Sequence, residues 1–271
     1  MKNKLIMISM VALALVACNK KSPAPITDNI NADSITADTI VPETAVCELI
    51  PNAVIDIDGN TYNAVKIGEQ VWMAENLRTT RYANGTTIPS GKTESDREPY
   101  RYAPDNRESI VALCGYLYNW PAVMNGAESS WEKPSGVQGI CPDGWHVPSM
   151  PEWEQLTKYV GSWDQYACGN HNSYIAKSLA STDGWILCVD NCDPGNEPNR
   201  NNATGFNALP AGLYYSGNSC DNFGRWACFW TASDNGGYGT ISYNIYYDNS
   251  LVGDNGSNYA FNGFSVRCVK D

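Results

Sequence analysis

Clusters of glycine and asparagine divide the second half of the chain into short segments, and this division limits the folds open to it. Two such clusters are SDNGGYG, residues 233–239, and VGDNGSN, residues 252–258. Glycine and asparagine accept the positive backbone φ of tight turns, so we expect turns at both places. The apolar runs around them are short and suit strands better than helices. They are residues 205–215, 226–233, 240–249 and 263–271.

The first half shows one meander and three short helices. Alternating apolar residues around Asp58–Asn60 and a second reversal at 67–70 predict three antiparallel strands. Ser149 and Glu152 form an S-x-x-E capping box that predicts a helix ending near Gly161. Two shorter helices are expected, one from Cys114 until Pro121 interrupts it and one over 172–181. Short strands around two or three short helices predict a single compact α+β domain.

The first seventeen residues have the pattern of an export signal. A basic start is followed by an apolar run from Leu5 to Ala17, too short to span a bilayer core of about 30 Å. Small residues precede Cys18, and this resembles the lipobox at which bacterial lipoprotein signals are cut and the new N-terminal cysteine is acylated. We therefore expect a signal peptide at 1–17 and lipidation at Cys18.

Residues 18–48 are expected to form a flexible, disordered tether between the lipid and the domain. The segment carries proline, threonine, aspartate and asparagine but no aromatic residue, so it cannot bury a core. Loss of the two positive charges of Lys2 and Lys4 with the signal takes the formal charge from −11 to −13. A chain this acidic has no general affinity for nucleic acid, so membrane contact is expected through the acyl chains alone.

Residues 49–271 remain for one domain with its own core. Ten cysteines in an exported chain predict disulfides, and nine of them remain once Cys18 carries lipid. Nine is odd, so at least one is free or pairs outside the chain. Spacing leaves the pairing open. It allows a hairpin bridge between Cys220 and Cys228, or a short loop between Cys188 and Cys192.

Six segments in order resemble the Fibrobacter succinogenes major paralogous domain, the FISUMP family of exported bacterial proteins. They are DIDGNTYNAVKIGEQVWMAENLRTTRYANGTTIP, CGYLYNWPAVMN, CPDGWHVPSMPEWEQL, GFNALPAGLYYSG, FWTAS and GFSVRCVKD. The resemblance covers nearly all of the chain after the tether and implies no reaction. The family's closing pattern is similar to that of C-type-lectin-like folds, in which the last strand returns to the start of the domain. This similarity implies that Cys268 is bridged to an earlier cysteine such as Cys141.

The motif CPDGWHVP at 141–148 is interpreted as structural. A zinc or catalytic role for Cys141 and His146 would need further thiolates or imidazoles, and the chain has only two histidines. We expect His146 to be packed, with its ring nitrogens on nearby backbone, and no cofactor to be bound. Calcium is the alternative, because Glu197 and Asn199 in an EPN triplet offer hard oxygen ligands. The partner segment that calcium-dependent lectins supply is absent from the sequence.

The candidate ligand-binding residues lie near the last strands. Alternation along 240–249 turns Asn244, Tyr246 and Asp248 to one side, and the nearby Trp226 and Tyr238 add aromatic rings. Tyrosine and asparagine make adaptable contacts in binding surfaces. The alternative is a set of polar turns over a tyrosine-rich core.

These observations favour a non-catalytic binding module for a polysaccharide or a surface protein. We expect it in the cell envelope, held by lipid to a membrane, with the outer membrane favoured, and facing the periplasm or the exterior. One alternative is a structural or assembly subunit of the envelope that uses the odd cysteine. Another is an enzyme on a lectin-like fold, although the sequence offers no nucleophile, base and orienting group together.

Overall fold

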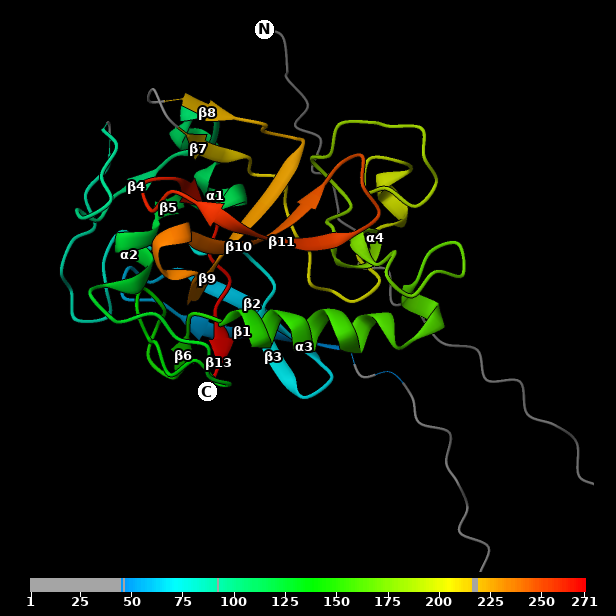
Figure 1. Ribbon diagram of the computed structural model, residues 1–271, viewed down its shortest axis with the longest axis horizontal. Helices are drawn as coiled ribbons and strands as arrows, with labels where there is room; N and C mark the ends of the chain where they lie inside the picture. Colours follow the sequence, from blue (N-terminus) through cyan, green and yellow to red (C-terminus); the bar gives the residue numbers. More distant parts are fainter. Residues whose placement is uncertain (1–44, 46, 92, 216–218) are drawn as a thin grey trace, which may run out of the picture. The chain divides into compact units, whose positions relative to one another are not determined.

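The computed structural model describes residues 45, 47–91, 93–215 and 219–271. The predicted signal peptide, Cys18 and most of the predicted tether lie outside the described residues. Within them, short antiparallel strands form three sheets with a few short helices around them (Figure 1), so the α+β fold class is confirmed. No helix of the described part combines the length and apolarity needed to cross a membrane.

The first sheet joins the start of the domain to its end. Its strand order is β1-β2-β3-β13-β6, and all pairs are antiparallel. The strands are β1 (Cys47–Ile55), β2 (Thr61–Ile67), β3 (Gln70–Met73), β6 (Trp145–His146) and β13 (Val269–Lys270). The predicted meander of three strands is confirmed. Its first strand begins at Cys47, two residues before the predicted domain boundary at 49.

The other two sheets are made by the middle and the C-terminal half of the chain. The second has the order β11-β10-β9 and the third β4-β5-β12-β7-β8. The second sheet contains β9 (Trp226–Asp234), β10 (Thr240–Tyr246) and β11 (Val252–Asn258). The third contains β4 (Arg101–Tyr102), β5 (Leu117–Asn119), β7 (Leu213–Tyr215), β8 (Ser219–Asp221) and β12 (Gly263–Phe264).

Strand β11 corrects a prediction, because its sequence VGDNGSN was expected to be a turn. Its backbone pairs with β10, from Ile245 opposite Val252 to Thr240 opposite Asn258, with an irregularity between Thr240 and Ser242. Asn258 completes the pairing with its amide, which donates to the Thr240 carbonyl at 3.0 Å. An edge strand that faces water needs no apolar side chains on either face. The polar sequence of β11 therefore gave no sign of a strand.

Among the α-helices of the described residues, one is long and three are about one turn each. The α-helices are α1 (Val111–Cys114), α2 (Trp120–Met124), α3 (Met150–Gly161) and α4 (Ala176–Leu179). The capping box of Ser149 and Glu152 is present, so the prediction for α3 is confirmed at both ends. The short helix expected within 172–181 is α4.

A helix begins where the expected one was to stop, because α2 starts at Trp120, one residue before Pro121. Strand β5 fills the segment before it, and Pro121 occupies the first turn of α2. The Asn119 side chain accepts a hydrogen bond from the Ala122 amide at 3.2 Å and caps the helix. Proline lacks an N–H, but the first turn of a helix has no acceptor for one, so proline is favoured there.

The expected terminal strand is divided between two sheets. β12 pairs with β5 and β7 in the third sheet, and β13 pairs with β3 and β6 in the first. The segment between them, Ser265–Cys268, is fully buried. It contains Cys268, whose disulfide to Cys141 has a sulfur separation of 2.04 Å. The pairing implied by the family resemblance is thus present.

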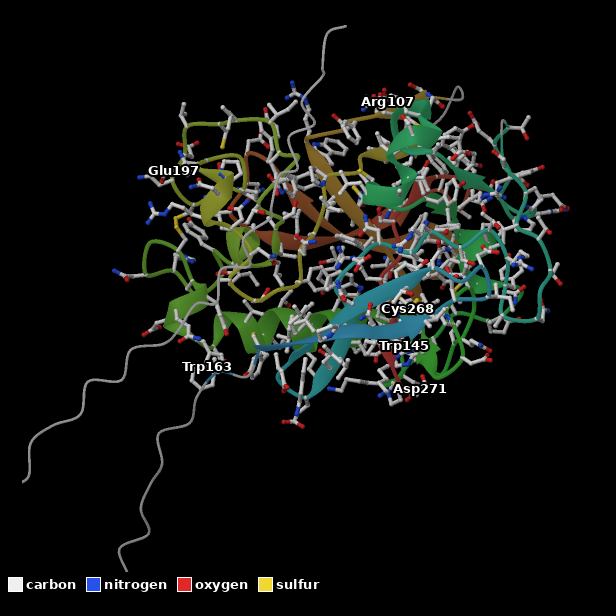
Figure 2. All side chains as sticks on the ribbon, turned by 180° about the vertical axis from the view of Figure 1, so that it is seen from behind. Arg107, Trp145, Trp163, Glu197, Cys268 and Asp271 are labelled. Atoms are coloured by element: carbon white, nitrogen blue, oxygen red, sulfur yellow. A yellow bond between two sulfur atoms is a disulfide. The ribbon has the colours of Figure 1, made fainter. Side chains whose placement is uncertain are left out.

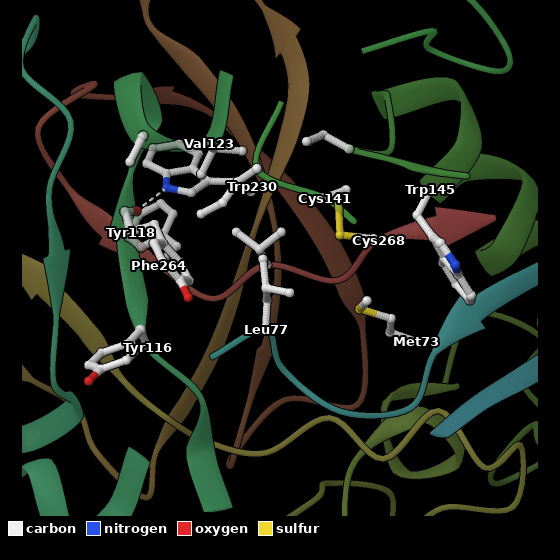
Figure 3. Close-up of a cluster of buried hydrophobic side chains, with 14 of the residues drawn as sticks. Met73, Leu77, Tyr116, Tyr118, Val123, Cys141, Trp145, Trp230, Phe264 and Cys268 are labelled. Carbon is white, nitrogen blue, oxygen red and sulfur yellow. Dashed lines mark hydrogen bonds between the residues drawn. A yellow bond between two sulfur atoms is a disulfide. The ribbon is translucent and has the colours of Figure 1, made fainter. Parts of the chain in front are cut away.

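The two larger of three buried clusters of side chains in the described residues form most of the core. Figure 3 shows the first, around the Cys141–Cys268 bridge, where the Trp230 indole donates to the Tyr118 carbonyl at 2.7 Å. The second lies beneath α3, where Trp153 stacks on Tyr243 with ring centroids 5.1 Å apart. The predicted burial of Trp145 and Trp153 is confirmed, with 4% and 1% of their surface exposed.

Candidate functional site

The five predicted ligand-binding residues do not form one surface. Trp226 and Tyr246 are half-buried and contact each other edge to face, with ring centroids 5.1 Å apart. Tyr238 is 85% exposed, but it precedes β10, whereas Asp248 follows it. A seven-residue strand spans about 20 Å, so these two residues lie at opposite ends of the sheet.

The prediction that Asn244 lies on an exposed binding face is wrong, because only 3% of its surface is exposed. β10 is the middle strand of its sheet, and residues on both of its faces are buried. The Asn244 side chain instead accepts a hydrogen bond from the Ser242 hydroxyl at 3.2 Å. Polar residues in alternation indicated a solvent face, but here they form a buried polar network.

Exposed aromatic rings gather at the Tyr238 end of this sheet, and we call Trp131, Tyr238 and Tyr259 the aromatic edge. Their exposed fractions are 48%, 85% and 59%. The Trp131 indole donates to the carbonyl of Asp234, the last residue of β9, at 3.0 Å. Tyr238 follows in the turn between β9 and β10.

Tyr259 reaches the same end from β11. A Cβ on Gly239 would lie 2.8 Å from the Asn258 carbonyl oxygen, so the backbones beside Tyr238 and Tyr259 pass close to each other. The Tyr259 ring stacks on Phe261 at 5.0 Å, with the ring planes inclined by 7°. Sequence reasoning missed Trp131 and Tyr259. A tryptophan between serines and a proline, outside any apolar periodicity, was the available signal for Trp131.

A second arrangement surrounds His146, at the junction of β6, α3 and the last residue of the chain. Its Nε2 lies 2.7 Å from Glu152 Oε1, and its Nδ1 lies 2.8 Å from Asp271 Oδ1. The side chains of His146 and Glu152 are each 3% exposed, and that of Asp271 is 61% exposed. The prediction that the ring nitrogens contact backbone is therefore wrong.

Glu152 is held in place by the start of its own helix. Its Oε2 accepts hydrogen bonds from the backbone amides of Ser149 and Ser135, at 2.9 and 3.1 Å. Burial lowers the pKa of His146, but the hydrogen bonds and charges of Glu152 and Asp271 raise it by more, and the net shift is upward. The two carboxylates therefore favour the protonated form of the His146 ring. With both nitrogens occupied, it holds β6, α3 and the chain end together.

The cluster of His146, Glu152 and Asp271 makes the free energy of unfolding depend on pH. Since the folded-state pKa is above the ordinary imidazole value, the contribution of His146 is complete below about pH 6.5 and is lost as pH rises through the raised pKa. We expect the native protein to have a higher unfolding free energy than His146→Gln at about pH 6, and this difference to shrink as the pH rises above about 6.5. Urea unfolding at each pH measures it. The exposed His171 supplies the control His171→Gln, and an equal pH dependence in both variants would contradict the account.

A pocket of about 340 Å³ lies beside the cluster, lined by Trp145, His146 and Asp271 among others. Figure 2 shows Trp145 and Asp271 near Cys268, with Glu197 on the far side of the molecule. Cys141 and Cys268 are oxidised, so neither thiolate is available to a metal or a substrate.

The EPN triplet leads into a turn of 3-10 helix at Pro198–Arg200, with Glu197 as the N-cap residue. Glu197 Oε2 accepts a hydrogen bond from Arg200 Nη1 at 2.9 Å, which engages one of the carboxylate oxygens proposed for calcium. Asn199 is exposed. In the described part of the chain, no group of three histidine, cysteine, aspartate or glutamate side chains is arranged to hold a metal ion. The calcium alternative stays a prediction.

The remaining cysteines differ from the pairings that spacing allowed. Cys192 is bridged to Cys168, not to Cys188, and Cys220 and Cys228 are both free. The free thiols within the described residues are Cys47, Cys114, Cys188, Cys220 and Cys228. Cys228 is buried, which raises its pKa to about 12 and keeps it protonated.

Fold and site together define an α+β domain of short antiparallel strands, closed by a disulfide and bearing exposed aromatic rings at one sheet end. Residues 65–270 match the family model described as Fibrobacter succinogenes major domain. The chain belongs to this family, as its six sequence segments indicated. No curated protein and no solved structure matches it. The likeness to C-type-lectin-like folds stays a prediction.

Proposed function

We propose that this chain is an envelope lipoprotein whose folded domain binds a polysaccharide without chemical turnover. The observation that carries the proposal is the aromatic edge. Large rings left in water at one end of a sheet mark an interaction site, and their flat faces suit the apolar faces of sugar rings. A surface protein that covers the same rings is the other ligand class.

The anchor in this proposal is an acylated Cys18, with the outer membrane favoured and the domain facing the periplasm or the exterior. The lipobox supports it, and the 28 residues from Asn19 to Val46 would give a reach on the order of 30 Å. The mass of the N-terminal peptide from the envelope fraction tests it. An unmodified chain that still contains residues 1–17 would contradict it.

Removing rings of the aromatic edge should weaken polysaccharide binding. We expect Tyr238→Ala and Trp131→Ala each to lower affinity roughly ten- to thirtyfold, as for a central aromatic contact worth about 2 kcal/mol. Affinity electrophoresis of the detergent-solubilised chain against a panel of neutral and acidic polysaccharides measures the change.

A matched control is Tyr215→Ala, because Tyr215 is 43% exposed but belongs to β7 in another sheet. The control should bind as the native chain does. Equal losses in all three variants, or none in any, would show that binding does not use the aromatic edge.

A structural or assembly subunit is the second candidate, and the free thiols favour it. Cys47, Cys188 and Cys220 are partly exposed in the described structure. A neighbouring subunit could form an intermolecular disulfide with one of them. Non-reducing electrophoresis of membranes distinguishes the two functions, because a strictly monomeric chain would argue against assembly.

A further inference from the structure

A polar pocket of about 500 Å³ lies between α4 and the loop at 188–200. Its lining includes two cations, Lys177 and Arg200, from different elements. Its other polar lining residues include Gln165 and Asn191, which carry side-chain amides, and Glu197, which carries a carboxylate. This volume falls within the range of about 300–1,000 Å³ that is usual for small-molecule sites.

The loop that forms one wall is fixed to the rest of the domain. The Cys168–Cys192 bridge holds its middle, and the Gly195 amide donates to the Tyr247 carbonyl at 2.8 Å. A Cβ on Gly195 would lie 2.3 Å from the Ile186 carbonyl oxygen, so only glycine allows this approach. The pocket is therefore built into the fold.

Lys177 has a donor left for a ligand. Its ammonium donates to the carbonyls of Asp193, at 3.3 Å, and of Asn196. An ammonium has three N–H groups, and within the described residues these two acceptors account for two of them. Burial lowers the pKa of Lys177, because the charged form loses hydration there. An anion in the pocket would restore favourable contacts to that charge.

Arg200 adds a planar fork on the exposed side of the pocket. Its Nη1 donates to Glu197 Oε2 at 2.9 Å, and 70% of its side chain is exposed. A guanidinium has five N–H donors, and two of them can bind one carboxylate together. The amides of Gln165 and Asn191 can donate to and accept from sugar hydroxyls.

We propose that this pocket binds a sugar residue that carries a carboxylate, a uronate of an acidic polysaccharide. The site lies beyond the Tyr246 end of β10, near Tyr247, and the aromatic edge lies at the other end, about 20 Å away by strand length. It is thus a second site, and its existence does not depend on binding at the aromatic edge. With a formal charge of −11, the chain attracts polyanions through local cations only.

The test uses the full chain in detergent and isothermal titration calorimetry. The probes are oligogalacturonate and alginate oligomers, each compared with its methyl ester, which keeps the sugar backbone and removes the charge. We expect at least one acidic oligomer to bind about tenfold more tightly than its ester, and Lys177→Gln and Arg200→Gln each to reduce that affinity about tenfold. Lys158→Gln, at a 76% exposed side chain on α3, should change nothing.

Equal affinity for acid and ester, or no affinity for either acidic oligomer, would overturn the proposal. Lys177→Gln also removes two hydrogen bonds to the loop. If this variant unfolds at a lower temperature than the native chain, the result for Arg200→Gln decides. Polyglutamate is the further probe, since binding as tight as that of the oligomers would show that the sugar ring is not recognised.

Tyr238→Ala separates this proposal from the function assigned to the aromatic edge. If acidic oligomers bind Arg200→Gln more weakly but bind Tyr238→Ala as tightly as the native chain, they bind at the pocket independently of the aromatic edge. The reverse result would overturn the pocket and leave the aromatic edge.

Discussion

Replacing Arg267 with methionine should lower the free energy of unfolding by about 4 kcal/mol. Arg267 is fully buried, and its guanidinium donates to the Asn76 side chain and to three backbone carbonyls. The carbonyls belong to Met73, Phe206 and Asn207, and the distances range from 2.5 to 3.0 Å. Methionine fills a similar volume but leaves these acceptors without donors inside the core.

The Arg267 site shows why lysine cannot replace arginine there. The guanidinium also lies over the Phe206 and Phe229 rings, at 4.8 and 5.6 Å from their centroids. Burial lowers its pKa to about 9, which still leaves it protonated at neutral pH. An ammonium lacks the planar fork that reaches several acceptors at once.

Urea unfolding of Arg267→Met and Arg267→Lys measures both effects. The lysine variant should lose less than the methionine variant but still more than about 1 kcal/mol. Arg97→Met is the control, because Arg97 is exposed. A loss at position 267 no larger than that of the control would contradict the network.

Removing the Cys141–Cys268 bridge should destabilise the domain at least as much as Arg267→Met. The bridge spans a sequence separation of 127 residues, and loop-closure entropy for such a span corresponds to about 5 kcal/mol. For a domain of this size we expect the melting temperature of Cys141→Ala/Cys268→Ala to fall by about 10–20 °C. Differential scanning calorimetry measures the change.

The second bridge supplies the matched comparison. Cys168 and Cys192 are separated by 24 residues, so their removal should cost about 3.5 kcal/mol, less than that of the first. The second bridge closes a short loop, whereas the first joins Cys268 in the C-terminal segment to Cys141 in the middle of the domain. A larger effect from Cys168→Ala/Cys192→Ala would contradict this ranking.

Local rules accounted for the elements that depend on neighbouring residues. The helix α3 follows from Ser149, Glu152 and an apolar face, all within twelve positions. The meander β1-β2-β3 follows from turns between consecutive strands. The Cys141–Cys268 pair lies outside this class, and only the family resemblance implied it.

Errors arose where tertiary context changed the meaning of a local pattern. β11 has the composition of a turn, yet it pairs along one edge of β10. Asn244 alternates as a surface residue would, yet β10 is covered on both faces. Pro121 ended a predicted helix but in fact lies in the first turn of α2, because the aromatic residues before it belong to β5.

The ionised groups of the core were beyond sequence reasoning, since their partners are distant in the chain. His146 contacts Asp271 across 125 positions, and Arg267 contacts Asn76 across 191. A single arginine between Val266 and Cys268 carries no sign of burial. The pocket lined by Lys177 and Arg200 could not be predicted either, because α4 and the 188–200 loop meet only in the folded domain.

The most direct test asks whether the domain holds a polysaccharide or alters it. The full chain is incubated with each polysaccharide that it retains, and the bound polymer and the newly formed reducing ends are measured in the same sample over time. The account predicts retention of the polymer with no increase in reducing ends. Reducing ends that accumulate with time, or a chain that retains no polysaccharide at all, would contradict it.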